Sequence, residues 1–391
     1  MPPSDSSATV LSSVLPWCWR AGAVTVGIVA VAGGILYAKQ DSLLYFPEIG
    51  GIPKRPRDNP RGYRSPDERN IPFDNLRIPC ADGVHIHAWF LPFLSDQDTL
   101  SSTHNNNNNN TPTLIFFHGN AGNIGLRLPN ALQMVQNLQA HVLLVEYRGY
   151  GDSDPVPPTE TGLRRDAEAA LHYLLRRAQE PTAATYRIDP QRIFVFGRSL
   201  GGAVALHLAD YAQRQQIRLA GVVVENTFTS IADMVDQLMP FLTPIKPFVL
   251  KIGWDSTTLV PSLTAPLLYL AGSADELVPP SHMQRLYRAS KSSRLAKMHV
   301  VDGGTHNETW LQGGAAYWHQ FRSFLAAASA TSVPGNGTPA STVSQSAATE
   351  HATVPSMIPT MSNRFVDLAK EAVTGQGVPV SPNSQRNKKI E

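Results

Sequence analysis

Cysteine is scarce in this chain, with Cys18 and Cys80 as the two cysteines in 391 residues. Two cysteines exclude a framework of several disulfides and a zinc site built from cysteines. Charge is nearly balanced, with 33 lysines and arginines against 31 aspartates and glutamates. No basic patch with interleaved aromatic residues is present, so the sequence gives no reason to expect a nucleic-acid partner.

Glycine-rich motifs that bind nucleotides are also missing. The segment 149–151 has neither the lysine of a phosphate-binding P-loop nor the complete spacing of a dinucleotide fingerprint. Neither a metal nor a cofactor is expected from this sequence. The chain is 42% hydrophobic and 16% charged, which is typical of a globular protein with some membrane character.

One long apolar run lies near the N-terminus. Its eighteen residues, 21–38, carry no charge and are just long enough to span a bilayer. Trp17, Trp19 and Tyr37 lie near its ends, where aromatic residues anchor helices at membrane interfaces. A cleaved signal peptide is the alternative, but its apolar region would be shorter and would end at small residues. We therefore predict a single-pass transmembrane helix over 21–38, preceded by an N-terminal segment over 1–20.

The orientation of this anchor stays open. Four basic residues follow the apolar run within twenty positions and favour a cytoplasmic catalytic domain. Glycosylation sequons begin at Asn109 and Asn336 and would instead fit a lumenal domain. The sequence therefore predicts attachment to a membrane without assigning the side.

The remaining chain divides by composition into a linker, one folded domain and a tail. Residues 39–70 are rich in proline, arginine and glycine without a sustained period, and we interpret them as a linker that wraps the domain. Residues 327–391 are rich in serine, threonine, alanine and proline and are expected to be a disordered tail. Within the domain of residues 71–326, segment 95–113 contains six consecutive asparagines and is expected to be a disordered loop.

Short apolar runs alternate with helical stretches through this domain. The Asp82-Gly83 step between two alternating runs predicts an antiparallel hairpin at its start. From Thr113 on, continuous apolar runs of four to six residues predict buried parallel strands. These predicted strands are 114–117, 142–145, 193–196, 219–224, 267–271 and 296–301. We therefore expect an α/β fold with about eight mostly parallel strands and helices on both faces.

The segment Gly197–Gly201 has the pattern Gly-x-Ser-x-Gly, between the apolar run 193–196 and a helix-forming run that begins at Ala203. A serine in such a strand-to-helix turn has a strained backbone that exposes its hydroxyl above the sheet. Glycines are needed around it because a Cβ there would collide with the neighbouring strand or helix. We therefore predict Ser199 as the nucleophile and the backbone N–H of Leu200 as an oxyanion donor.

A base and an orienting acid follow at later strand ends, where ligands bind in parallel sheets. His306 lies in a glycine-containing loop after the last predicted strand and is the expected general base. Asp275 follows the strand 267–271 and is the expected acid, with Glu276 and Asp302 as alternatives. The chain order serine, aspartate, histidine is the order expected on this type of fold.

The loop 118–123 after the first of these parallel strands would complete the site. Its small residues let backbone N–H groups turn toward the nucleophile, and we predict the Asn120 N–H as the second oxyanion donor. His118 precedes the glycine turn and is expected to brace this loop. Two other histidines, His207 and His282, lie on predicted helices and are poorer candidates for the base.

Three further segments are expected near the site. Residues 147–151 follow a strand as a tight loop at its rim, and Ser153 is interpreted as a turn residue without a catalytic role. Residues 225–228 follow another strand and would line the pocket. The apolar segment 234–254 contains three prolines and would wall an acyl pocket, lean on a membrane surface, or pack as an ordinary crossover.

Together these motifs resemble the α/β-hydrolase superfamily, over residues 76–325. Five motifs are similar to those of its membrane-anchored bud-emergence-like subgroup: residues 118–123, 147–151, 197–202, 225–228 and 304–307. The resemblance implies a serine hydrolase with a type II signal anchor, often at endomembranes such as the endoplasmic reticulum. It also implies Ser199, Asp275 and His306 as the catalytic triad. The asparagine-rich segment and the long tail depart from the family pattern.

We therefore expect hydrolysis of an ester or thioester of an acyl or lipid-type substrate, through an acyl-enzyme on Ser199. A serine peptidase would use the same triad, so this alternative stays open. A non-catalytic membrane scaffold is an alternative of a different class. The presence of all three triad residues argues against it.

Overall fold

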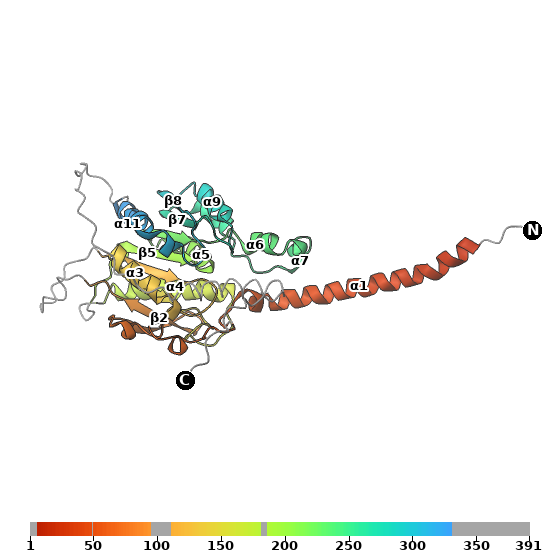
Figure 1. Ribbon diagram of the computed structural model, residues 1–391, viewed down its shortest axis with the longest axis horizontal. Helices are drawn as coiled ribbons and strands as arrows, with labels where there is room; N and C mark the ends of the chain where they lie inside the picture. Colours follow the sequence, from red (N-terminus) through yellow and green to blue (C-terminus); the bar gives the residue numbers. More distant parts are fainter. Residues whose placement is uncertain (1–5, 49, 95–110, 181–185, 331–391) are drawn as a thin grey trace, which may run out of the picture.

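The computed structural model covers residues 1–391 and describes residues 6–48, 50–94, 111–180 and 186–330. Its centre is one eight-stranded sheet in the order β1-β2-β4-β3-β5-β6-β7-β8 (Figure 1). The strands are β1 (Asp74–Pro79), β2 (His85–Leu91), β3 (Thr113–Phe117), β4 (His141–Val145), β5 (Ile193–Arg198), β6 (Gly221–Glu225), β7 (Leu267–Gly272) and β8 (Ala296–Val301). β2 pairs antiparallel with β1 and β4, and all other neighbours pair parallel. The mostly parallel sheet predicted from the sequence is confirmed.

The burial of each strand follows its place in the sheet. Every residue of β3, β4, β5 and β6 is buried, as expected for apolar strands in a sheet that is covered on both faces. β1 alternates between covered and exposed residues, and β8 is mostly half-buried, because these strands form the two edges. The predicted hairpin joins β1 to β2 through Asp82 and Gly83, and Gly83 has a φ of 81°.

Helices cover both faces of the sheet. One apolar core contains side chains of α4, α5 and α9, and a second core contains side chains of α3 and α11. These helices are α3 (Leu128–Leu138), α4 (Glu160–Arg177), α5 (Leu200–Arg214), α9 (Pro280–Ala289) and α11 (Gly314–Ala330). The two separate cores account for the layered α/β arrangement seen in Figure 1.

Two predicted boundaries in the domain need correction. Helix α11 continues to Ala330, beyond the predicted end at residue 326, because Ala328 is buried in the second core. The rest of the predicted tail, residues 331–391, lies outside the described residues. The predicted loop 95–113 ends earlier than expected, because Thr113 already belongs to β3. Residues 95–110 of that loop also lie outside the described residues.

The N-terminal helix α1 (Ser6–Leu44) is 39 residues long and extends away from the sheet (Figure 1). Its segment Ala23–Leu44 is long and apolar enough to cross a membrane. The predicted boundaries of the anchor differ from this helix at both ends, since the helix includes residues before 21 and after 38.

Polar contacts with the domain explain why α1 continues beyond its apolar run. Gln40 Nε2 donates to Val249 O at 3.1 Å, and Gln40 Oε1 accepts the Lys251 N–H at 2.8 Å. Asp41 forms an ion pair with Lys251 at 2.9 Å. The expectation of an irregular linker from residue 39 is therefore wrong up to Leu44, because these partners stabilise another turn of helix.

The rest of the predicted linker does lie along the domain. It contains the short helices η1 (Pro56–Asp58) and η2 (Pro66–Arg69). Phe46 forms an isolated parallel bridge with Ala121, and Asn123 Nδ2 donates to Pro53 O at 2.9 Å. These contacts join the linker to the loop after β3.

Residues 231–254, here named the insert, follow β6 and contain α6 (Ile231–Leu238), η5 (Pro240–Leu242) and α7 (Lys246–Val249). The helices α6 and α7 project from the domain on the side where α1 leaves it (Figure 1). The short helix α8 (Ser256–Leu259) then leads back toward β7.

Candidate active site

Ser199 occupies the turn between β5 and α5. Its φ of 53° and ψ of −121° are unusual for a residue with a side chain, so the backbone is strained. The Ser199 N–H donates to Glu225 O at 2.9 Å, and Ser199 O accepts from Thr227 Oγ1 at 2.7 Å. The end of β6 and the residues after it therefore hold the strained turn in place.

The glycines around the serine leave no room for a side chain. A Cβ on Gly197 would overlap the Gly201 carbonyl, and a Cβ on Gly201 would overlap the carbonyl of Phe117 at the end of β3. Helix α5 therefore begins directly against the sheet. Since the helix starts at Leu200, the Leu200 N–H has no acceptor within it and is available for an oxyanion.

His306 and Asp275 form a buried pair in the loops after β8 and β7. His306 Nδ1 lies 2.8 Å from Asp275 Oδ2 and 3.0 Å from Asp275 Oδ1. Asp275 Oδ1 also accepts the N–H groups of Leu277 at 2.9 Å and Val278 at 2.8 Å. This fixed carboxylate orients the ring with Nδ1 as the donor, which leaves Nε2 to act as a base.

The three predicted triad residues follow β5, β7 and β8, at the same edge of the parallel part of the sheet. The structure brings Asp275 and His306 into contact. In the described part of the chain, no hydrogen bond joins Ser199 Oγ to the His306 ring. Catalytic hydrogen bonds are often long in free enzymes and tighten when the substrate binds.

Asn226 connects the serine turn with the histidine loop. It follows β6 directly, has a φ of 48°, and accepts the Gly272 N–H on Oδ1 at 2.8 Å. Its Nδ2 donates to His306 O at 3.0 Å and to Thr309 Oγ1 at 2.9 Å. The sequence predicts residues 225–228 as pocket lining, but Asn226 is buried and joins three backbone segments. A polar residue directly after a buried strand is the sequence signal for this role.

The alternative acids have other partners. Glu276 Oε2 accepts the backbone N–H of His306 at 3.2 Å, so it supports the histidine loop and not the ring. Asp302 Oδ1 accepts from Ser273 Oγ at 3.1 Å. The geometry therefore favours Asp275 as the acid that orients His306.

The alternative histidines are held on helices. His207 on α5 packs against Trp254 with ring centroids 5.1 Å apart, and burial lowers the pKa of His207 to about 3. His282 on α9 lies 2.7 Å from Thr229 Oγ1, and burial lowers the pKa of His282 as well. Compared with His207 and His282, His306 is the histidine whose ring lies within hydrogen-bond distance of a carboxylate, that of Asp275.

The loop after β3 lies directly beside the serine. A Cβ on Gly119 would come within 3.6 Å of the Ser199 Cβ. His118 is fully buried, and its Nδ1 donates to Gly119 O at 2.7 Å. His118 Nε2 lies 3.2 Å from Glu146 Oε1, but the two atoms lack hydrogen-bond geometry. The Tyr147 hydroxyl donates to His118 O at 2.8 Å. His118 therefore braces the loop from inside the domain.

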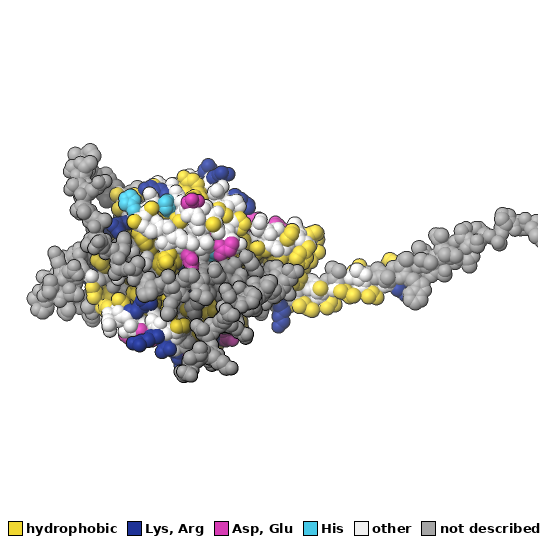
Figure 2. All heavy atoms as spheres, viewed as in Figure 1, with side chains coloured by type: hydrophobic (Ala, Val, Ile, Leu, Met, Phe, Trp, Pro, Cys, Tyr) yellow, Lys and Arg dark blue, Asp and Glu magenta, His cyan; other side chains and the backbone are white. Residues whose placement is uncertain are grey.

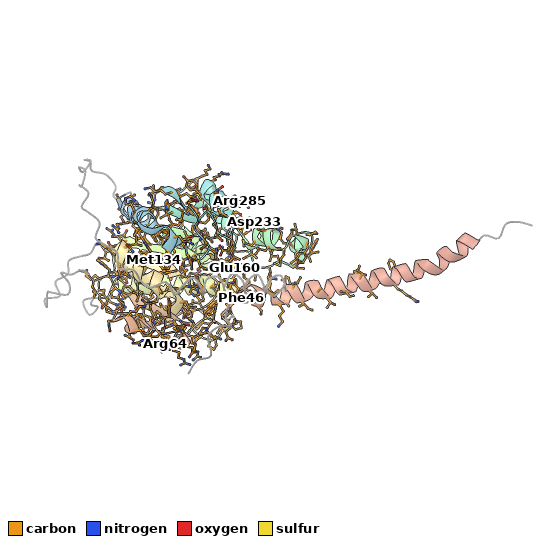
Figure 3. All side chains as sticks on the ribbon, in the orientation of Figure 1. Phe46, Arg64, Met134, Glu160, Asp233 and Arg285 are labelled. Carbon is orange, nitrogen blue, oxygen red and sulfur yellow. The ribbon has the colours of Figure 1, made fainter. Side chains whose placement is uncertain are left out.

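The Asn120 side chain makes contacts that the sequence does not predict. Its Oδ1 accepts from the Tyr150 hydroxyl at 3.0 Å and from the Phe46 N–H at 3.3 Å, and its Nδ2 donates to Leu44 O. Phe46 lies at the base of α1, where the chain enters the domain (Figure 3). The residue predicted as an oxyanion donor therefore also joins the 147–151 loop to the base of α1.

An ion pair lies directly before the serine turn, between Arg198 and Glu225. Arg198 Nε is 2.6 Å from Glu225 Oε1, and both side chains are buried. The Tyr317 hydroxyl donates to Glu225 Oε2, and burial, followed by the charge of Glu225, raises the pKa of Tyr317 well above its usual value. Arg198 Nη2 donates to Asn130 Oδ1 at 2.8 Å. These contacts join β5 and β6 to α11 and α3.

Ser153 has the contacts of a turn residue. Its hydroxyl accepts the His87 N–H at 2.8 Å and donates to Glu146 O at 3.0 Å. Both contacts fix backbone, and none involves the residues of the candidate triad.

Within residues 6–48, 50–94, 111–180 and 186–330, no cluster of three or more histidine, cysteine, aspartate or glutamate side chains has the arrangement of a metal site.

Comparisons with known proteins give a consistent relationship. The profile of the alpha/beta hydrolase family matches residues 114–262. The chain is 35% identical over 313 residues to the alpha/beta hydrolase domain-containing protein WAV2 of Arabidopsis thaliana, which covers 76% of this chain and 91% of that protein. It is 32% identical over 325 residues to Protein bem46 of Schizosaccharomyces pombe, covering 83% and 97%. An uncharacterized membrane protein of Saccharomyces cerevisiae is 30% identical over 302 residues, covering 77% and 93%.

Among solved structures, an esterase of Pyrococcus furiosus is similar with a TM-score of 0.52 and 19% identity, over 71% of this chain and 98% of that chain. At this identity the similarity shows the fold alone. The sequence relatives show more, because they are at least 30% identical over more than nine-tenths of their length. The chain therefore belongs to the α/β-hydrolase family and, within it, to the proteins of the bem46 type.

Proposed function

We propose that this chain is a membrane-anchored serine hydrolase that cleaves an ester or thioester of an acyl or lipid-type substrate. The observation that carries the proposal is the strained turn at Ser199 on the same sheet edge as the His306–Asp275 pair. Membership of the α/β-hydrolase family supports the same assignment. Both lines of support point to acyl transfer through a serine.

In this mechanism Ser199 Oγ attacks the acyl carbonyl while His306 Nε2 takes the hydroxyl proton. Asp275 accepts the Nδ1–H and stabilises the imidazolium that forms. The N–H groups of Leu200 and Asn120 bind the negative oxygen of the tetrahedral intermediate. His306 then gives the proton to the leaving alcohol or thiol, and an acyl group remains on Ser199. A water molecule, deprotonated by His306, attacks this acyl-enzyme, and His306 returns the proton to Ser199 Oγ as the acid leaves.

Helix α1 is the anchor in this proposal and crosses the membrane once. The length and apolar character of Ala23–Leu44 support the crossing, and so does the description of the Saccharomyces cerevisiae relative as a membrane protein. We place the protein at an endomembrane, as the bud-emergence-like resemblance implies. Carbonate extraction of membranes tests the anchor, and protease protection of sealed vesicles determines the side of the catalytic domain.

A fluorophosphonate probe tests the nucleophile, because it reacts covalently with an activated serine. We expect the wild-type chain to label and Ser199→Ala to lose labelling together with about 10⁴-fold of its ester turnover. Ser153→Ala is the matched control and keeps both. Equal labelling of Ser199→Ala and wild type would show that another residue is the nucleophile.

Two experiments separate this function from its alternatives. When esters, thioesters and peptides are offered as substrates, we expect turnover of esters and thioesters but not of peptides. Cleavage of peptides would identify a serine peptidase. In cells, Ser199→Ala at normal abundance is expected to behave like a deletion. Full cellular function of that variant would instead identify a non-catalytic scaffold.

A further inference from the structure

The tip of the insert carries large exposed apolar side chains. Phe241 and Phe248 are 75% and 83% exposed, and Leu238, the last residue of α6, is 39% exposed. Figure 2 shows hydrophobic side chains gathered on this tip and along the nearby part of α1. A cluster of this kind on an otherwise compact domain marks an interaction surface.

The insert packs directly against α1. A Cβ on Gly33 would lie 3.4 Å from a methyl group of Val249, the last residue of α7. Within residues 31–40, the covered positions of α1 are Gly33, Leu36 and Gln40, which share one helix face. The remaining faces of this part of α1 are exposed. The insert and the apolar run of α1 therefore lie side by side.

The contact with Val249 lies well inside the apolar run. Gly33 precedes Lys39, the first charge after the run, by six residues, which corresponds to about 9 Å along the helix axis. Apolar faces of interfacial helices reach about 5–10 Å into the boundary between headgroups and acyl chains. A membrane that covers α1 up to Lys39 therefore also covers the tip of the insert, because Phe248 is adjacent to Val249.

The charged groups at the base of α1 lie where this arrangement requires them, and the two charges of α6 and α7 nearest the tip, Asp236 and Lys246, form an ion pair with each other at 2.6 Å. Lys251 follows α7, forms an ion pair with Asp41 at 2.9 Å, and lies 5.8 Å from the centre of the Tyr37 ring. Lys39 is exposed on the adjacent turn of α1. Basic and aromatic residues at one level are typical of the headgroup region of a membrane. The positions of these charged and aromatic residues therefore predict the same depth of the membrane surface along α1 as the apolar tip does.

The insert is fixed to the domain at its base. Asp233 on α6 forms an ion pair with Arg285 on α9 at 3.1 Å, and the two side chains lie together in Figure 3. Glu160, at the start of α4, accepts the N–H groups of Gly253 at 2.8 Å and Trp254 at 3.1 Å. The Trp254 indole donates to the Tyr45 hydroxyl at 2.9 Å. These contacts hold the insert to the domain and to the base of α1.

We propose that the tip of the insert, formed by Leu238, Phe241 and Phe248, is embedded in the headgroup and outer acyl layer of the membrane that α1 crosses. This inference rests on the proposed membrane anchor. The occupant of the apolar surface is the lipid bilayer, since the surface continues the apolar face of α1. The domain then has two attachments to one membrane, a crossing helix and an embedded tip, and its orientation on the membrane is fixed.

Depth-dependent quenching of a fluorophore tests this arrangement. The full chain carries Cys18→Ser, and the buried Cys80 is left in place. One further cysteine is then introduced in each variant: Phe241→Cys, Phe248→Cys, Val31→Cys or Val300→Cys. Each variant is labelled with nitrobenzoxadiazole and reconstituted into phosphatidylcholine vesicles with or without doxyl-labelled phosphatidylcholine. Val31→Cys reports the anchor, and Val300→Cys is the control, since Val300 is exposed on the edge strand β8. Thermal unfolding of each variant confirms that it is folded.

We expect doxyl lipid to quench the label at both insert positions and in the anchor, and to leave the β8 control unchanged. Quenching in the anchor without quenching at Phe241→Cys and Phe248→Cys would overturn the inference while the proposed anchor stands. A lack of quenching at all four positions would overturn both. Quenching of the β8 control together with the insert would mean that the whole domain adsorbs to lipid, which also contradicts an embedded tip.

Discussion

The side-chain carbonyl of Asn120 accepts a hydrogen bond from the Phe46 N–H at 3.3 Å, so the base of α1 is joined to the loop beside the candidate nucleophile. Asn120 Nδ2 donates back to Leu44 O and completes the link. The backbone that we propose to bind the oxyanion is therefore held, in part, by the end of α1. We therefore expect a displacement of α1 to change the position of that backbone.

Asn120→Ala tests this link, because it keeps the backbone N–H and removes the side-chain bonds. We expect kcat for a soluble ester to fall about 10-fold to 100-fold, since small displacements of catalytic groups have effects of this size. KM should change little, because the acyl carbonyl is bound more strongly in the transition state than in the ground state. Tyr150→Phe removes one bond to Asn120 Oδ1 and should give a smaller loss. An unchanged kcat in Asn120→Ala would contradict the positioning role.

Asp275→Asn tests the orienting acid with little change in shape. The asparagine amide no longer holds the His306 Nδ1–H, so Nε2 is not presented as a base, and we expect kcat to fall about 10⁴-fold. Steady-state kinetics at neutral pH measures the loss. Glu276→Gln is the matched control, because Gln still offers an oxygen to the His306 N–H and should retain most activity. A larger loss in Glu276→Gln than in Asp275→Asn would exchange the two roles.

The buried ring of His207 predicts a loss of stability in acid. Burial lowers the pKa of His207 from 6.5 to about 3, so the unfolded chain binds a proton below pH 6.5 that the folded chain does not bind. The free energy of unfolding is therefore highest, as far as His207 is concerned, above pH 6.5. It falls by on the order of a few kcal/mol as the pH decreases toward 3. In His207→Leu, the free energy of unfolding should depend less on pH between 6.5 and 4 than in wild type. Urea titrations across this range measure it, and parallel curves would contradict the assignment.

The ion pair of Arg198 and Glu225 predicts a large effect on stability from a single substitution. Glu225→Leu leaves the buried guanidinium without its carboxylate, and we expect about 3–5 kcal/mol of destabilisation. Arg198→Met combined with Glu225→Leu should recover much of this loss, because no uncompensated charge remains buried. Urea unfolding of the single and double variants measures the difference. Equal destabilisation in both would show that packing, and not the unpaired charge, dominates.

The exposed position of Phe248 predicts a substrate-dependent effect on activity. Phe248→Asp places a charge on the surface that we propose to be embedded, so turnover of a long-chain ester in phosphatidylcholine vesicles should fall about 10-fold or more. Turnover of a short ester in solution should stay within about twofold, because the triad is not involved. Val300→Asp is the matched control and should affect neither assay. Equal losses on both substrates would indicate damage to the fold.

Much of the fold and the position of the candidate triad follow from local features of the sequence. The runs that become β5, β7 and β8 each end at a glycine or an aspartate, so Ser199, Asp275 and His306 are recognisable as residues that follow strand ends. A Cβ at Gly197 or Gly201 would overlap nearby backbone, which is the steric constraint that the Gly-x-Ser-x-Gly pattern predicts.

The supporting contacts were not predictable in the same way, because they join residues far apart in the chain. Asn226 binds the histidine loop 80 residues later, and Asn120 binds Leu44, 76 residues earlier. Gln40 holds the end of α1 in a helix through acceptors and donors in the insert. None of these pairs produces a periodic pattern in the sequence. A prediction from local propensity therefore ends the N-terminal helix too early and assigns Asn226 to the wall of the pocket.

The docking of α1 on the insert has a consequence for biosynthesis. Gln40 accepts the N–H of Lys251, which is made 211 residues later. At about 5–20 residues per second, the ribosome takes about 10–40 s to supply this partner after Gln40 has been added. During that interval the base of α1 cannot make its contacts with the insert. The contacts between the base of α1 and the insert therefore form late in synthesis, so on a ribosome stalled before residue 251 the end of α1 lacks its Lys251 partner.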